Sequence, residues 1–102
     1  MIRRTLLGLA LFLSACTLLT AQATTVFTDA YRSFKEGEKH FNQGLYALAQ
    51  SEFDRTLNLL RPLNEPDAEL LRAQAELNYA RAAVQLEQPD GEKLILDFVR
   101  RY

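Results

Sequence analysis

The stretch DAELLRAQAELNYARAAVQLE, residues 67–87, decides the fold because its apolar side chains fall on two opposite sides of a helix. At about 100° per residue, the two apolar sets lie about 180° apart, with polar strips between them. One set contains Leu70, Ala73, Leu77, Ala80 and Val84, and the other contains Leu71, Ala75, Tyr79, Ala82 and Leu86. A surface helix needs a single apolar face. This helix is therefore expected to pack between neighbouring helices, and its alanines would let them approach closely.

The flanking segments continue the same helical period. Apolar residues at steps of three and four predict helices over residues 28–42, 45–60 and 92–101. Gly44 separates the first two of these helices, because glycine tolerates the left-handed conformation just past a helix end. Pro66 suits a first helical turn, where its missing N–H would have no partner anyway. The chain is therefore predicted to be all-α, with helices joined by short connections.

The last predicted helix carries more apolar surface than a helix facing water needs. Its apolar residues cover more than half of its circumference, and they are Leu94, Ile95, Leu96, Phe98, Val99 and Tyr102. A helical array normally ends in a unit with a polar outer face. We therefore expect residues 92–101 to be covered by a further helix, by a second copy of the chain or by a partner.

The first 23 residues have the composition of an export signal. Residues 1–4 (MIRR) are positively charged, residues 5–13 (TLLGLALFL) are uncharged and apolar, and small residues follow. This order is typical of a secretory signal peptide. Threonines and a glutamine dilute the later part of the uncharged run, which disfavours the alternative of a retained membrane anchor. We expect residues 1–23 to be a signal peptide and residues 24–102 to be one exported helical domain.

Two cleavage sites compete in this leader. Residues 13–16 (LSAC) resemble the bacterial lipobox, in which Cys16 would become the lipidated first residue of the mature chain. Residues 21–23 (AQA) fit the small-x-small pattern of ordinary signal peptidase. The first site predicts a lipoprotein attached to the outer membrane, and the second predicts a soluble periplasmic protein. Contact with a membrane is expected only through a lipid on Cys16.

Composition and charge argue against several functions. The 12 basic and 13 acidic residues give a net charge of −1, which becomes −3 without Arg3 and Arg4. Nucleic-acid binding needs a basic face, so no nucleic-acid partner is expected. The single Cys and single His cannot form a zinc site by themselves. With no G-x-S-x-G elbow and no phosphate-binding glycine loop, we predict no catalytic residue, no cofactor and no metal site.

Residues 30–63 resemble a tetratricopeptide repeat. The residues that carry the resemblance are Gly37, the GLY sequence at 44–46, Ala49, Phe53 and the Leu57–Leu60 end of the second helix. Residues 67–102 resemble a second, more divergent unit, and a shift of 45 places aligns Phe34 with Tyr79 and Phe53 with Phe98. The family's own period is about 34 residues. The resemblance implies two stacked antiparallel helical hairpins, about 28–63 and 67–102, and a simple helical bundle is the alternative.

The resemblance also implies a non-catalytic module that binds a protein or a peptide. In this family the first helix of each hairpin lines a concave groove, so polar residues of 28–42, the adjoining Gln43 and polar residues of 67–87 are the expected contacts. These residues are Arg32, Lys35, Glu36, Lys39, His40, Gln43, Gln74, Asn78, Arg81 and Gln85. The tyrosines are expected to pack between helices, and they are Tyr31, Tyr46, Tyr79 and Tyr102. The alternatives are an N-terminal cap of a longer scaffold with no ligand of its own, and a small adaptor that dimerises through residues 92–101.

Overall fold

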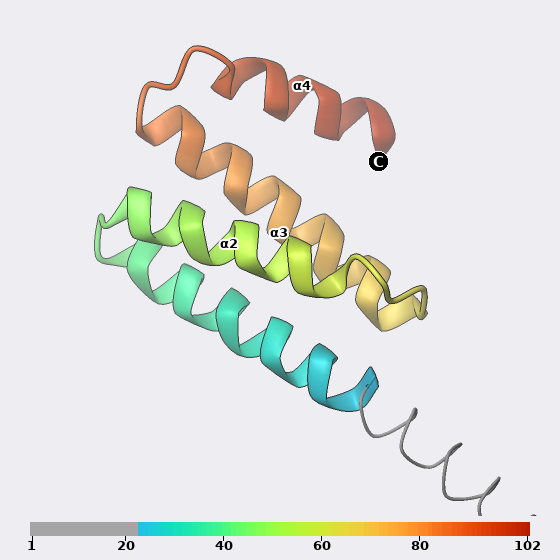
Figure 1. The fold of residues 1–102 in the computed structure, drawn as a ribbon. Coiled ribbons are helices and arrows are strands. Elements are labelled where there is room, and N and C mark those ends of the chain that lie inside the picture. Colours follow the sequence, from blue (N-terminus) through green and yellow to red (C-terminus); the bar gives the residue numbers. More distant parts are fainter. Residues whose placement is uncertain (1–22) are drawn as a thin grey trace, which may run out of the picture.

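A computed structural model describes residues 23–102 of the chain, and every element in this part is a helix (Figure 1). The helices are residues 23–42, α2 (Tyr46–Leu60), α3 (Pro66–Gln85) and α4 (Gly91–Arg101). The all-α prediction is confirmed. The first described helix includes residues from 23 onward, whereas the sequence pattern predicts a start at residue 28. The predicted signal peptide up to residue 22, with Cys16, lies outside the described residues. Within residues 23–102, none of the helices is both long and apolar enough to cross a lipid bilayer.

Successive helices run antiparallel and lie next to one another, in the order of the chain (Figure 1). The turn between helix 23–42 and α2 needs Gly44, whose φ is +77°. The N–H of Leu45 donates to the carbonyl of His40 at 2.9 Å across this turn. The next connection ends at Glu65, which has an extended conformation, and Pro66 then starts α3 as predicted.

The hydrophobic core lies between helix 23–42, α2 and α3. Its buried members are Ala30, Phe34, Ala49, Phe53, Leu60, Leu63, Ala68, Leu71 and Ala75. The rings of Phe34 and Phe53 pack with their centroids 5.7 Å apart. Gly37 makes this possible, because a Cβ at that position would lie 2.6 Å from Cε1 of Phe53. The helix crossing therefore depends on a small residue opposite a large ring.

The prediction that the helix at 67–87 packs between neighbours is confirmed in outline. α3 packs against α2 and α4, and it also meets helix 23–42, where the guanidinium of Arg81 lies 4.8 Å from the centroid of the Phe41 ring. The apolar sets differ in detail, because Leu70 is 62% exposed and Val84 is 41% exposed. The buried positions of α3 are instead occupied mainly by alanines, which allow close packing on two sides.

Candidate functional site

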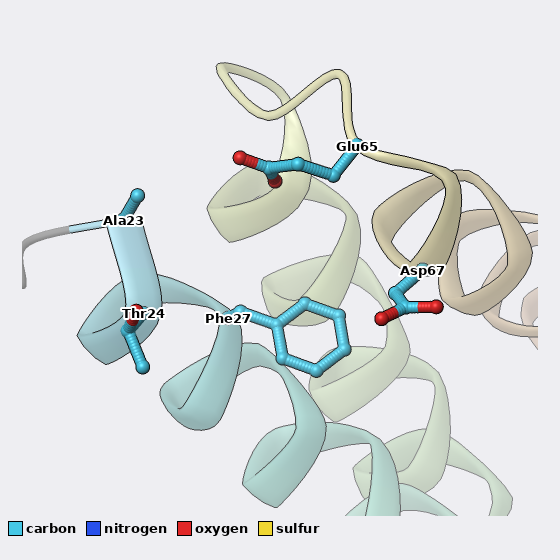
Figure 2. A pocket seen from close by; sticks show the side chains of 5 residues that line it. All are labelled: Ala23, Thr24, Phe27, Glu65 and Asp67. Carbon is cyan, nitrogen blue, oxygen red and sulfur yellow. The ribbon is translucent and has the colours of Figure 1, made fainter. Parts of the chain in front are cut away.

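Two open hollows adjoin each other where helix 23–42 runs beside the start of α3. One hollow, of about 190 Å³, is lined by Phe27, Tyr31, Asp67, Leu70, Leu71 and Gln74. The other, of about 230 Å³, is lined by Ala23, Thr24, Phe27, Glu65 and Asp67. Figure 2 shows the ring of Phe27 pointing from helix 23–42 toward Asp67. Because Phe27 and Asp67 belong to both hollows, the two form one continuous trough, which is the candidate site.

The apolar part of the trough is open to solvent. Tyr31 is 47% exposed and Leu70 is 62% exposed, and both line the same hollow. The ammonium of Lys35 lies 5.4 Å from the centroid of the Tyr31 ring and 3.1 Å from a carboxylate oxygen of Glu38. The hydrogen bond and the charge of Glu38 raise the pKa of Lys35 above its ordinary value.

The four tyrosines, which were expected to pack between helices, differ in their burial. Tyr31 and Tyr102 are exposed, at 47% and 61%, whereas Tyr46 and Tyr79 are partly buried. Tyr46 packs edge-on against Phe41, with ring centroids 5.1 Å apart. Helical spacing alone does not separate a tyrosine inside an apolar face from one at its margin, and Tyr31 lies at the margin.

Three of the predicted groove residues form a connected strip on α3. The side chain of Asn78 donates to the carbonyl of Gln74 at 2.8 Å, and its own oxygen accepts from Arg81 at 3.0 Å. Arg81 extends the strip to the Phe41 ring of helix 23–42. Gln85 is on the same side of the helix, because it lies four residues after Arg81. Gln74 joins this strip to the trough, since it lines the hollow with Tyr31 and Leu70.

The predicted groove residues of helix 23–42 do not form one connected surface. Lys35 lies over the Tyr31 ring, but the hollows that form the trough are lined neither by Lys35 nor by any other predicted residue of this helix. Arg32 pairs with Asp29 at 3.8 Å, and Glu36 approaches His40 at 4.0 Å, along the helix itself. Lys39 and Gln43 are exposed. His40 is half-buried and lies about 180° around the helix from Tyr31, and its buried Nδ1 finds no hydrogen-bond partner among residues 23–102.

Of the nine residues that line the trough, only Gln74 was among the predicted contacts, and the eight others include Phe27, Tyr31 and Leu70. A usable signal was present for two of them. Tyr31 and Leu70 each lie four residues before a polar position, Lys35 and Gln74, so each shares a polar strip at the edge of an apolar face. An apolar residue in such a strip is a candidate for exposure.

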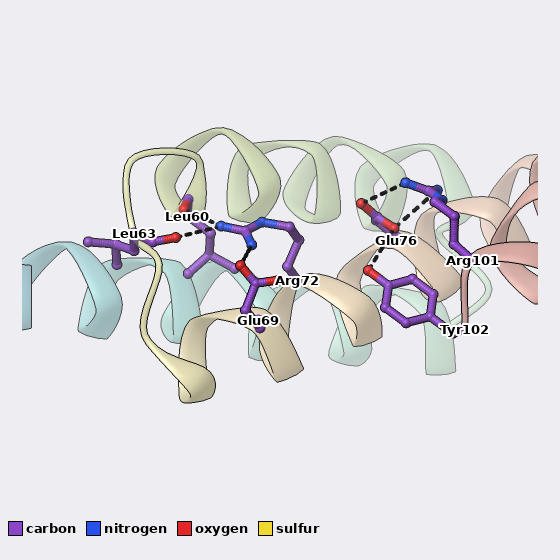
Figure 3. A network of polar contacts seen from close by, with 7 residues as sticks. All are labelled: Leu60, Leu63, Glu69, Arg72, Glu76, Arg101 and Tyr102. Carbon is purple, nitrogen blue, oxygen red and sulfur yellow. Dashed lines mark hydrogen bonds and ion pairs between the residues drawn. The ribbon is translucent and has the colours of Figure 1, made fainter.

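A second set of polar contacts lies outside the trough and holds α3 against the end of α2 and the end of α4 (Figure 3). Arg72 donates to the carbonyls of Leu60 and Leu63 and pairs with Glu69. Further along, Glu76 pairs with Arg101 at 3.1 Å and accepts from the hydroxyl of Tyr102 at 3.4 Å. Burial and the charge of Glu76 raise the pKa of Tyr102, which keeps its hydroxyl protonated. These contacts attach α3 to the end of α2 and to the end of α4.

A metal site needs several ligand side chains gathered in one place. Between residues 23 and 102, no group of three or more His, Cys, Asp or Glu side chains is placed to hold a metal ion.

Comparisons with protein-family models, with curated proteins and with solved structures found no match for the chain.

Proposed function

We propose that the chain is a non-catalytic protein–protein interaction module that binds a peptide or a partner helix along the trough. One observation carries this proposal: Tyr31 and Leu70, both largely exposed, line the same open hollow between two helices. Apolar and aromatic residues in a concave, solvent-open position are typical of the anchor points of protein interfaces. The amides and the guanidinium of the adjoining strip can hydrogen-bond a bound backbone.

We further propose that the helices form a tetratricopeptide-like stack of two hairpins. The packing of Gly37 against Phe53 supports this proposal, because a small residue opposite a large one is what the resemblance implies at the crossing of paired helices. The positive φ of Gly44 and the complete burial of Ala49 agree with the same register. In such a stack, helix 23–42 and α3 are the first helices of the two hairpins, and the trough lies between them.

The proposed interaction can be tested by cross-linking at defined positions. With a photoreactive residue in place of Leu70, we expect one discrete protein adduct in cells that express the full sequence. The same substitution at Leu48 is the matched control, because Leu48 is 53% exposed and lies on α2, outside the trough. We expect Tyr31→Ala to abolish the adduct at position 70, and Tyr102→Ala to preserve it.

An absence of any adduct at position 70 would contradict the proposal and would favour a capping segment with no ligand of its own. An adduct that forms equally at positions 70 and 48 would also contradict it, because the contact would then not depend on the trough. Circular dichroism of the Tyr31→Ala variant provides the folding control. Tyr31 is 47% exposed, so we expect its truncation to change the free energy of unfolding by less than about 1 kcal/mol.

We also propose that the protein is exported from a bacterial cytoplasm, as the sequence of residues 1–23 indicates. The test is the intact mass of the protein from a bacterial envelope fraction. A chain that begins at Cys16 and carries added acyl mass would identify a lipoprotein attached to a membrane. A chain that begins near Thr24 would identify a soluble periplasmic module. Recovery of the unprocessed 102-residue mass alone would contradict export.

A further inference from the structure

α4 carries a second exposed apolar surface, on the side of the molecule formed by the last helix. Leu96 is 56% exposed, Val99 is 65% exposed, and both lie on an 11-residue helix whose other side packs on α3. Scattered exposed leucines need no explanation. Here, however, two neighbouring apolar residues share one helical stripe with Glu92, since these positions are three and four residues apart.

The charges beside this surface are arranged symmetrically about Leu96. Glu92 lies four residues before Leu96, and Arg100 lies four residues after it. Both side chains are exposed, and neither forms a side-chain hydrogen bond or an ion pair within residues 23–102. The neighbouring Arg101, by contrast, is held by Glu76 at 3.1 Å. The exposed stripe therefore has an unpaired acid at one end and an unpaired base at the other.

We propose that this surface is a self-association site, at which α4 pairs antiparallel with α4 of a second copy of the chain. A two-fold axis through Leu96 places Glu92 of each copy opposite Arg100 of the other copy, because the two residues are equally far from the axis. It also brings Leu96 of the two copies together at the axis, and it places Val99 of each copy on the same side of the interface as Glu92 of the other. A two-fold interface is self-complementary in this way: the same surface serves both partners.

An acidic first turn and a basic last turn suit the dipole of any helix. They also make the two ends of α4 opposite in charge, which favours antiparallel over parallel pairing of identical helices. A parallel pair would bring like charges together at both ends. The charge pattern therefore favours the antiparallel orientation for two copies of this chain.

The pairing is expected to be weak. An 11-residue helix is about 16 Å long, and one such helix per copy buries less than the ~1,200–2,000 Å² of a stable specific interface. We expect a dimer that forms reversibly as the protein concentration rises from about 10 μM toward 1 mM.

The experiment is sedimentation equilibrium of the protein purified from cells that express the full sequence. A reducing agent is present, so that a disulfide through Cys16 cannot contribute. We expect a monomer–dimer equilibrium that Leu96→Glu abolishes, because the two introduced carboxylates would meet at the two-fold axis. Leu48→Glu is the matched control, since Leu48 is 53% exposed and lies on α2. This control is expected to leave the dimer unchanged.

Charge reversal at Glu92 and at Arg100 tests whether the two α4 helices pair antiparallel. Glu92→Arg and Arg100→Glu are each expected to weaken dimerisation on the order of tenfold, because each places like charges opposite one another twice per dimer. The double variant is expected to restore the original affinity. A protein that remains monomeric at 1 mM overturns the proposal and leaves the surface to another segment or another protein. A dimer that resists Leu96→Glu, or a double variant without restoration, overturns it as well.

Discussion

Phe53→Ala is expected to lower the free energy of unfolding by about 3–5 kcal/mol. Phe53 is completely buried, its ring contacts Phe34 at a centroid distance of 5.7 Å, and it fills the space left by Gly37 on the facing helix. Removing the ring leaves a cavity in the core between three helices, and the backbones around it cannot close together freely. A core of this size supplies only about 3–5 kcal/mol in total. The variant should therefore be largely unfolded at 25 °C.

Chemical denaturation followed by circular dichroism measures this effect. Phe53→Leu is the graded companion, because it retains most of the volume and is expected to stay folded with a loss of about 1–1.5 kcal/mol. Leu48→Ala, at an exposed position of the same helix, should change the stability by less than about 0.5 kcal/mol. If Phe53→Ala lost less than about 1 kcal/mol, the ring would not be part of the core, and the register of the first hairpin would be wrong.

The elements of the fold could be predicted from the sequence because their signals are local. The three- and four-residue apolar steps predict the helices, and Gly44 and Pro66 mark two of the connections. The burial of Phe53 follows from its central place in an apolar face. These features depend on residues within a few turns of one another, so the local sequence pattern is enough to predict them.

The trough could not be predicted in the same way, because it depends on how two helices far apart in the sequence face each other. Leu70 belongs to an apolar face of α3, yet it is 62% exposed because it lies where helix 23–42 leaves an open hollow. A helical-wheel projection of residues 28–42 does not show which side of this helix will face α3. For this reason the predicted strip on α3 is close to the trough, whereas Arg32 and Glu36 on the first helix are turned away from it.

Arg72 is a single residue whose contacts could not be predicted from the sequence. Its substitution is the second prediction with a large expected effect. In the sequence it belongs to a polar strip of the helix at 67–87, and a polar strip indicates a solvated surface. In the structure its guanidinium donates to the carbonyl of Leu60 at 2.7 Å and to that of Leu63 at 2.8 Å. These partners are backbone atoms, which are present at every position of the chain. No pattern of side chains could have identified them.

We expect Arg72→Met to lower the free energy of unfolding by about 1.5–3 kcal/mol, because two charge-assisted hydrogen bonds to the end of α2 are lost. Leu60 is the last residue of α2, and the last carbonyls of a helix have no partner within the helix. The last turn of α2 contains no basic residue, so Arg72 supplies from α3 the positive charge that this helix end favours. Methionine keeps the apolar stem of the side chain and removes only the guanidinium.

Arg72→Lys separates charge from geometry, because lysine keeps the positive charge but has a single nitrogen, whereas the guanidinium contacts both carbonyls through Nη2 and Glu69 through Nη1. We expect it to fall between the wild type and Arg72→Met in stability. Amide hydrogen exchange gives the local readout. The N–H of Leu63 donates to the carbonyl of Leu60 at 2.9 Å, and it should exchange faster in both variants because the end of α2 is held less firmly. Arg55→Met, at an exposed arginine of α2, is the control. Equal losses at positions 55 and 72 would mean that the guanidinium of Arg72 does not fasten the end of α2, and that α3 is held there by its apolar contacts alone.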